Sequence, residues 1–177
     1  MARGIDVELG FAPYLSVSGP EGRVDGVSDL LLRARFNLAG LEEGPSFAII
    51  PFLNLPTASG GLGATHVEGG VTLAAGLDIA EGWDLTFTLT GAAIAREIAG
   101  TGALVEGGVA LGRSLGERTG VCVEFFAARA EAGSLASVNL GATRLLGPET
   151  QIDANVSIGA IGEADAVRLS LGLARRF

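Results

Sequence analysis

Apolar residues alternate with polar or small residues along almost the whole chain. A period of two is typical of β-strands whose two faces meet different surroundings. We therefore expect an all-β protein with ten antiparallel strands, over residues 5–17, 27–38, 46–55, 67–79, 83–94, 102–112, 119–129, 135–146, 151–160 and 166–177. Turn-rich segments separate many of them, and no linker divides the chain, so residues 1–177 should form a single domain.

On one face of every predicted strand, no charged residue interrupts the middle of the strand. In the strand predicted over 83–94, for example, this face carries Trp83, Leu85, Phe87 and Leu89. Where cations share the apolar phase they stand at strand ends, as Arg3, Arg113, Arg129, Arg144 and Arg175 do. A long cationic side chain at the end of a lipid-facing band can reach the headgroups.

The opposite face is polar or small, and its charges would line the interior of a barrel. The candidate lumen-lining residues are Asp29, Arg33, Arg35, Glu68, Asp84, Glu106, Glu124, Asp153, Arg168 and Arg176. Because both signs share this phase, we expect a mixed charge network, with pairs across the lumen among them, and no wide water channel.

Two architectures fit this alternation. In a soluble sandwich or lipocalin-like barrel the apolar face points inward, and in a membrane barrel it points to lipid. Predicted strands of about 10–13 residues are long enough to cross a bilayer at a tilt, and the polar face has no Lys. The aromatic content of 6% argues the other way, since membrane barrels usually carry aromatic girdles. We favour an antiparallel up-and-down transmembrane β-barrel of ten strands, or a twelve-strand barrel lacking its N-terminal strands.

The two ends of the chain add expectations about assembly. Residues 1–25 carry no signal peptide, which predicts a start codon placed too late, or a processed or cloned fragment. We expect the strands over 5–17 and 166–177 to pair and close the barrel. The connections at 18–26 and 56–66 should then lie on the outer side, and the short turns at 80–82 and 147–150 on the periplasmic side.

Catalysis, cofactors and nucleic acid find little support in the sequence. The net charge is −8 without a basic patch, which argues against a nucleic-acid partner. His66 and Cys122 are the sole residues of their types, so neither a metal site nor a disulfide is expected. Residues 58–63 are Gly-rich but lack the Gly-Lys-Ser/Thr of a phosphate loop, and predict a flexible loop. Glu106 and Glu124 could form a catalytic pair, but structural lumen charges are the preferred interpretation, and we expect no enzyme.

Several stretches together resemble a known family. They are Gly-Val-Ser-Asp-Leu at 26–30, Arg-Phe-Asn-Leu at 35–38, Ile-Pro-Phe-Leu-Asn-Leu-Pro-Thr at 50–57, Val-Asn-Leu-Gly-Ala-Thr-Arg-Leu at 138–145, Gln-Ile-Asp-Ala at 151–154 and Gly-Leu-Ala-Arg-Arg-Phe at 172–177. Their order resembles the outer-membrane barrels of the "putative MetA-pathway of phenol degradation" family, over about residues 26–177. The sequence departs from the family at Arg175, where an aromatic residue is common, and in lacking a signal peptide.

The resemblance implies export to the bacterial outer membrane and passage of small molecules, with aromatic ones as candidates. We therefore expect a passive channel or transporter whose partners are the lipid bilayer, a small solute and the barrel assembly machinery. The C-terminal signal for that machinery would be Leu169, Leu171, Leu173 and Phe177. The alternatives are a structural or interaction barrel with a plugged lumen, and a soluble lipocalin-like barrel that binds a ligand.

Overall fold

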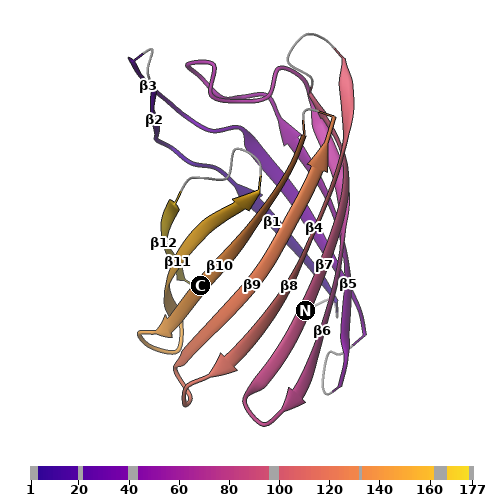
Figure 1. The fold of residues 1–177 in the computed structure, drawn as a ribbon, viewed down its shortest axis with the longest axis vertical. Helices are drawn as coiled ribbons and strands as arrows, with labels where there is room; N and C mark the ends of the chain where they lie inside the picture. The colour runs from indigo at the N-terminus through magenta and orange to yellow at the C-terminus, as the bar shows by residue number, and fades with distance from the viewer. Residues whose placement is uncertain are drawn as a thin grey trace.

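The computed structural model describes residues 4–19, 22–39, 44–95, 100–131, 133–161 and 167–175. Ten strands form one curved sheet: β1 (Ile5–Gly10), β4 (Leu30–Ala39), β5 (Ser46–Leu55), β6 (Glu68–Ala80), β7 (Trp83–Ala95), β8 (Thr101–Ser114), β9 (Thr119–Ala130), β10 (Gly133–Leu145), β11 (Thr150–Ile161) and β12 (Val167–Arg175). Two further strands, β2 (Leu15–Gly19) and β3 (Gly22–Gly26), form a separate hairpin. The predicted all-β, antiparallel up-and-down architecture is confirmed (Figure 1).

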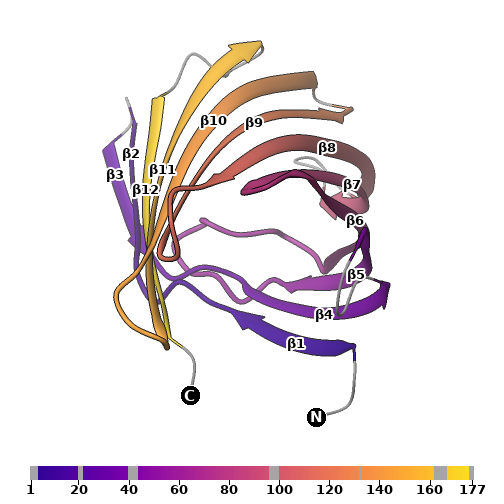
Figure 2. The ribbon, with the colours of Figure 1, turned by 90° about the horizontal axis from the view of Figure 1, so that it is seen from below.

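The sheet rolls up without closing. Each strand pairs with its neighbours in the order β1-β4-β5-β6-β7-β8-β9-β10-β11-β12, which leaves β1 and β12 as the two edges. Figure 2, seen from below, shows the curved wall and the two edge strands β1 and β12. The prediction that the first and last strands pair and close a ten-strand barrel is therefore wrong for this structure, and a twelve-strand barrel stays a prediction.

The first predicted strand is divided, and this shortens one edge of the sheet. The strand expected over 5–17 ends at Gly10, and the pattern resumes after an irregular segment as β2. Pro13 in that segment has no N–H to donate to a ladder. Ala12 instead exchanges two hydrogen bonds with Ser28, from its N–H to Ser28 Oγ (2.7 Å) and from the Ser28 N–H to its carbonyl (3.0 Å). The expected turn at 18–26 is thus largely the β2–β3 hairpin, and the next strand starts at Leu30 instead of residue 27.

The apolar residues of the sheet do not form a core. Among the described residues, Ala48 and Ala136 are the buried hydrophobic ones, whereas large side chains such as Leu89 (53% exposed) and Phe125 (55%) lie open on the surface. The two faces of β7 and β8 differ in exposure as the alternation predicts, with the more exposed face carrying the large apolar side chains. No described segment is a helix with the length and hydropathy needed to cross a membrane.

Candidate functional site

The inner surface of the curved sheet is formed by the polar phase of the strands. Thr90, at 6% exposure, is one of the most buried side chains of the described residues, and its hydroxyl lies 2.8 Å from that of Thr72 on the neighbouring strand. Glu124 lies on the same face and accepts a hydrogen bond from Asn139 Nδ2 (2.8 Å). Side chains on a concave face converge, which explains why this phase is the less exposed one in β6, β7 and β8.

Glycines on neighbouring strands make room for several inner carboxylates. A Cβ at Gly112 would overlap the carboxylate of Asp84, which stands opposite it in the β7–β8 register. A Cβ at Gly172 would overlap Asp153 in the same way across β11 and β12. The short acidic side chains therefore lie flat over backbone instead of reaching into the lumen.

The candidate lumen residues that the structure describes are distributed over much of the sheet. Arg33 and Arg35 lie on β4, Glu68 on β6, Asp84 on β7, Glu106 on β8, Glu124 on β9, Asp153 on β11 and Arg168 on β12, while Asp29 immediately precedes β4. Arg176 and Phe177 lie outside the described residues. Leu169, Leu171 and Leu173 share the outer phase of β12 and are 73–89% exposed.

The arginines of β4 bind to neighbours in the sheet. Arg33 Nη2 lies 3.0 Å from Glu8 Oε1, directly opposite it on β1. Arg35 donates from Nε to Asn37 Oδ1 (2.8 Å), and Asn37 Nδ2 donates to Asp6 Oδ2 (3.2 Å). The partners of Arg33 and Arg35 seen here come from β1 and β4, so these two cations bind locally and not to the far wall as expected.

Among the inner-face residues that the structure describes, Asp29 accepts the largest number of hydrogen bonds. Its Oδ1 accepts the Ala58 N–H (2.9 Å), and its Oδ2 accepts the Ala64 N–H (2.7 Å) and Asn54 Nδ2 (3.1 Å). Asn54 Nδ2 also lies 3.1 Å from Glu68 Oε2, whose other oxygen accepts the Ala95 N–H (2.9 Å). A chain of hydrogen bonds thus runs from Asp29 to β7 along the rim of the sheet.

These contacts control the ionisation of Asp29. Burial alone would raise its pKa, but hydrogen bonds from the backbone of Ala64 and Ala58, the Asn54 amide and the Thr57 backbone outweigh that effect and lower the pKa below its ordinary value of 3.8. Asp29 is therefore a carboxylate at neutral pH, and its acceptor oxygens suit the donors that surround it.

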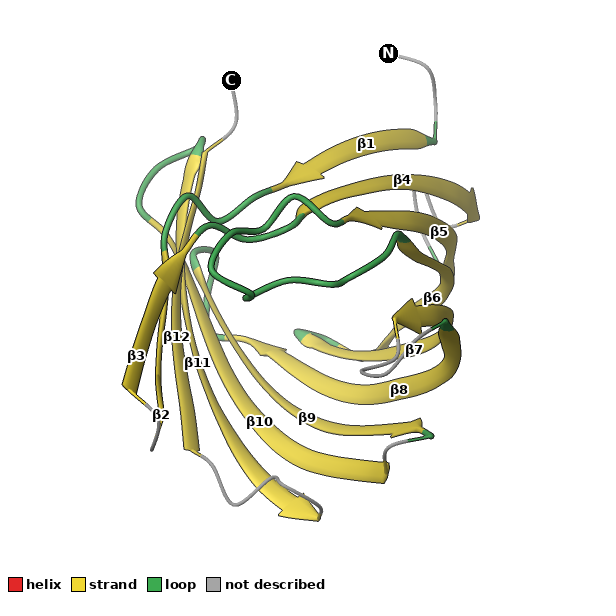
Figure 3. Cartoon of the chain, turned by 90° about the horizontal axis from the view of Figure 1, so that it is seen from above, coloured by secondary structure: helices red, strands yellow, loops and turns green. Residues whose placement is uncertain are grey.

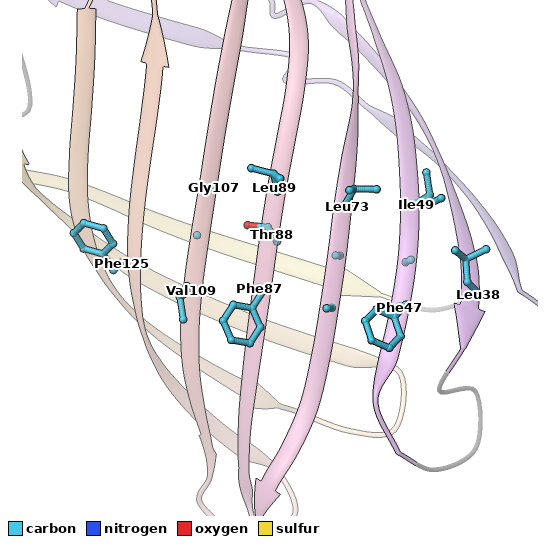
Figure 4. Close-up of a pocket in the computed structure, with 14 residues that line it drawn as sticks. Leu38, Phe47, Ile49, Leu73, Phe87, Thr88, Leu89, Gly107, Val109 and Phe125 are labelled. Carbon is cyan, nitrogen blue, oxygen red and sulfur yellow. The ribbon is translucent and has the colours of Figure 1, made fainter.

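The outer face presents a continuous apolar surface. A shallow groove of about 710 Å³ crosses it from β4 to β9, bounded by Phe47, Phe87 and Phe125. Figure 4 shows these rings with Val109 on the same side of the strands, and Gly107 among the residues that line the groove. At one end of this face Arg113 stacks over the Trp83 ring, 4.6 Å from its centroid.

Features that would support catalysis are sparse in the part of the chain that the structure describes. No group of three or more His, Cys, Asp or Glu side chains there could hold a metal ion. His66 is exposed and its Nδ1 lies 2.9 Å from Thr65 Oγ1, and Cys122 is a free, exposed cysteine.

The residues that bind the 56–67 connection were missed in the sequence. We expected a flexible loop at 58–63, but Ser59 is held by its N–H to the Val27 carbonyl (3.3 Å) and by its Oγ to the Val27 N–H (3.1 Å). Thr57 Oγ1 also accepts the Leu30 N–H (2.9 Å). The sequence did contain an indication of these contacts. Two of the stretches that carry the family resemblance, at 26–30 and 50–57, meet where the connection binds the segment before β4.

A comparison with curated proteins finds no match. A comparison with protein families finds one that covers the strands of the sheet, the β2–β3 hairpin and the connection at 56–67, since its match extends over residues 4–177. On this match the chain belongs to the family described as "putative MetA-pathway of phenol degradation".

Proposed function

We propose that the protein is an outer-membrane β-barrel that serves as a passive channel for small molecules. The observation that carries this proposal is the placement of the large apolar side chains. A soluble domain of this size hides most of its apolar surface, whereas here Leu73, Leu89 and Phe125 are about half exposed. Lipid is the surrounding in which such a surface is stable.

The inner face supports a channel rather than a ligand pocket. A lipocalin-like barrel would need an apolar interior, but the inward phase carries threonines, asparagines and carboxylates such as Glu68, Glu106 and Glu124. Polar groups of this kind can replace part of the hydration of a solute that passes. The family description connects the chain with phenol degradation, so small phenolic compounds are the first solutes to assay.

If the protein lies in a bilayer, the edge strands of the sheet need hydrogen-bond partners for their backbone groups. Unpaired N–H and C=O groups cost several kcal/mol each in hydrocarbon. The edges of β1 and β12 must therefore have backbone partners in the bilayer.

A structural barrel with a plugged lumen is the second candidate. It is favoured by the connection at 56–67, which lies over one end of the interior (Figure 3). Both candidates would lie in the outer membrane, and they differ in whether solutes pass through the barrel.

The test is purification followed by planar-bilayer recording. We expect the protein to need detergent for extraction and to give discrete single-channel steps. Release into buffer by salt or alkali alone would refute the membrane location. Insertion without conductance would refute the channel and favour the structural barrel.

A further inference from the structure

The connection between β5 and β6 is much longer than its task requires. These strands are adjacent and antiparallel, so a hairpin turn of about 2–5 residues could join them. The chain instead uses residues 56–67. Figure 3 shows this green connection crossing the space that the curved sheet encloses, and Figure 1 shows it at the same end as the β2–β3 hairpin.

Hydrogen bonds place the connection on the inner side of the sheet. Asn54 and Glu68 stand opposite each other across β5 and β6, in the inward phase. Asp29 binds Asn54 in that row and also accepts the N–H groups of Ala58 and Ala64. One carboxylate thus holds the connection at two points, six residues apart, above the lumen face.

The connection also fits closely against the segment before β4. A Cβ at Gly63 would overlap the Asp29 carboxylate, and one at Gly26 would lie 2.5 Å from the Ser59 carbonyl oxygen. Gly60 has φ +70°, a conformation that favours glycine, and a Cβ there would lie 2.9 Å from the Asp25 carbonyl oxygen. Contacts this close leave no room for side chains and fix the position of the loop.

We infer that residues 56–67 are a fixed constriction across one mouth of the barrel, that Asp29 is the residue that anchors it, and that this loop sets the size of solute that passes. The inference rests on the proposed channel function. In that channel the 56–67 loop is the element that limits passage, because the strands of the wall alone do not provide a constriction.

Asp29→Asn is the sharpest perturbation, because it keeps the size of the side chain. Both carboxylate oxygens accept N–H groups, and an amide offers one acceptor and one NH₂ donor. In either orientation the NH₂ would face a backbone donor, so at least one anchor point is lost. Asp25→Asn is the matched control, since Asp25 lies at the same end but binds Tyr14 and Arg23 within the hairpin segment.

Conductance and solute cut-off give the first readout. Asp29→Asn should raise single-channel conductance by about twofold or more and admit larger sugars in liposome swelling, because passage depends on the open diameter of a pore. Replacing residues 58–64 by a short Gly-Ser linker should do the same, and Asp29→Asn should add nothing to it. Asp25→Asn should match the parent protein. Unchanged conductance and cut-off in both Asp29→Asn and the shortened loop would overturn the inference.

Loop mobility gives a second readout that needs no transport. A nitroxide at Leu62→Cys, in a Cys122→Ser background, should give a restricted spectrum that becomes mobile with Asp29→Asn. An unchanged spectrum would overturn the anchoring role of Asp29. If Asp29→Asn mobilises the nitroxide but no variant conducts, the shortened loop included, the channel function is overturned. The anchoring of the loop by Asp29 is then retained.

Discussion

Arginine substitutions on the two faces of β7 test which face meets lipid. Leu89 points outward with 53% of its surface exposed, and Thr88 follows the inward phase. If the outer face meets hydrocarbon, Leu89→Arg buries a guanidinium in the bilayer. Thr88→Arg places the same group in the polar interior.

The depth of Leu89 can be worked out from the strand. A residue advances about 3.4 Å along a strand, and a tilt of about 40° leaves about 2.6 Å of this along the membrane normal. Leu89 is six residues from Trp83, which places it about 16 Å below that end of the strand, close to the middle of a hydrocarbon layer about 30 Å thick. Phe87 lies about 10 Å below the same end.

These depths set the expected magnitudes. Arg near the midplane costs about 2–4 kcal/mol, so Leu89→Arg should weaken folding by about two orders of magnitude, at 1.4 kcal/mol per tenfold. Phe87→Arg should cost less because it is shallower. Thr88→Arg should cost least, because its Oγ1 and Glu124 Oε1 both lie within 3.2 Å of the Cβ position of Gly108, so the new cation would meet a carboxylate.

The assay is equilibrium unfolding by urea in phospholipid vesicles. Leu89→Ala and Thr88→Ala measure the cost of losing each native side chain, and subtracting it leaves the effect of the charge. An equal cost at the two positions, or a larger cost at Thr88, would refute the assignment of the apolar face to lipid.

Four further outcomes are expected. Gly70→Ala should destabilise the protein by about 1–3 kcal/mol, because a Cβ at Gly70 would meet the backbone of β7. Gly91→Ala should leave the stability unchanged, because a Cβ at Gly91 meets nothing within 4 Å. Urea midpoints that shift equally in the two variants would contradict this. Trp83, the one tryptophan, should be quenched more by lipids brominated near the headgroup than by lipids brominated deep in the chain, and the reverse order would remove it from the interface. The pKa of Asp29 is lowered below its ordinary value of 3.8, so its carboxylate holds the 56–67 loop fully above pH 3.8 and progressively less as the pH falls below that value. Conductance should therefore rise in that acid range, and Asp29→Asn should abolish the rise. Glu68 is present in both proteins, so it does not account for a difference between them. Amides of β1 and β12 should exchange with deuterium in bilayers as slowly as those of β7 and β8, and fast exchange at both edges would contradict a membrane-spanning state.

The strands were predictable where the two faces of the sheet meet different surroundings. The segment expected over 83–94 is the strand Trp83–Ala95, and the one expected over 46–55 is Ser46–Leu55. The prediction failed over 5–17, where the alternation continues through Pro13 although the ladder does not. Side-chain periodicity reports which face a residue occupies, and it carries no information on whether a backbone N–H has a partner.

The candidate site was predictable in phase but not in its contacts. The alternation places Asp84 and Glu124 on the inner face, but that Asp84 lies over Gly112 depends on the register between β7 and β8. Register is a property of two strands, and a single sequence describes each of them alone. The anchoring role of Asp29 was hidden for a related reason, because its donors at Ala58 and Ala64 are backbone groups that any residue would provide.

The high glycine content acquires a physical role from this register. Glycine makes up 28 of the 177 residues, and it weakens an isolated strand. On the inner face, however, Gly112 and Gly172 leave space in which a neighbouring carboxylate can lie against backbone, and Gly63 does the same for Asp29. A wall lined in this way keeps its charges flat and its surface open, so the narrowest point of the interior is expected where backbone itself crosses it. The connection held by Asp29 is such a crossing, which is why, in the proposed channel, we assign the size limit to the loop at 56–67 and not to the charged residues of the strands.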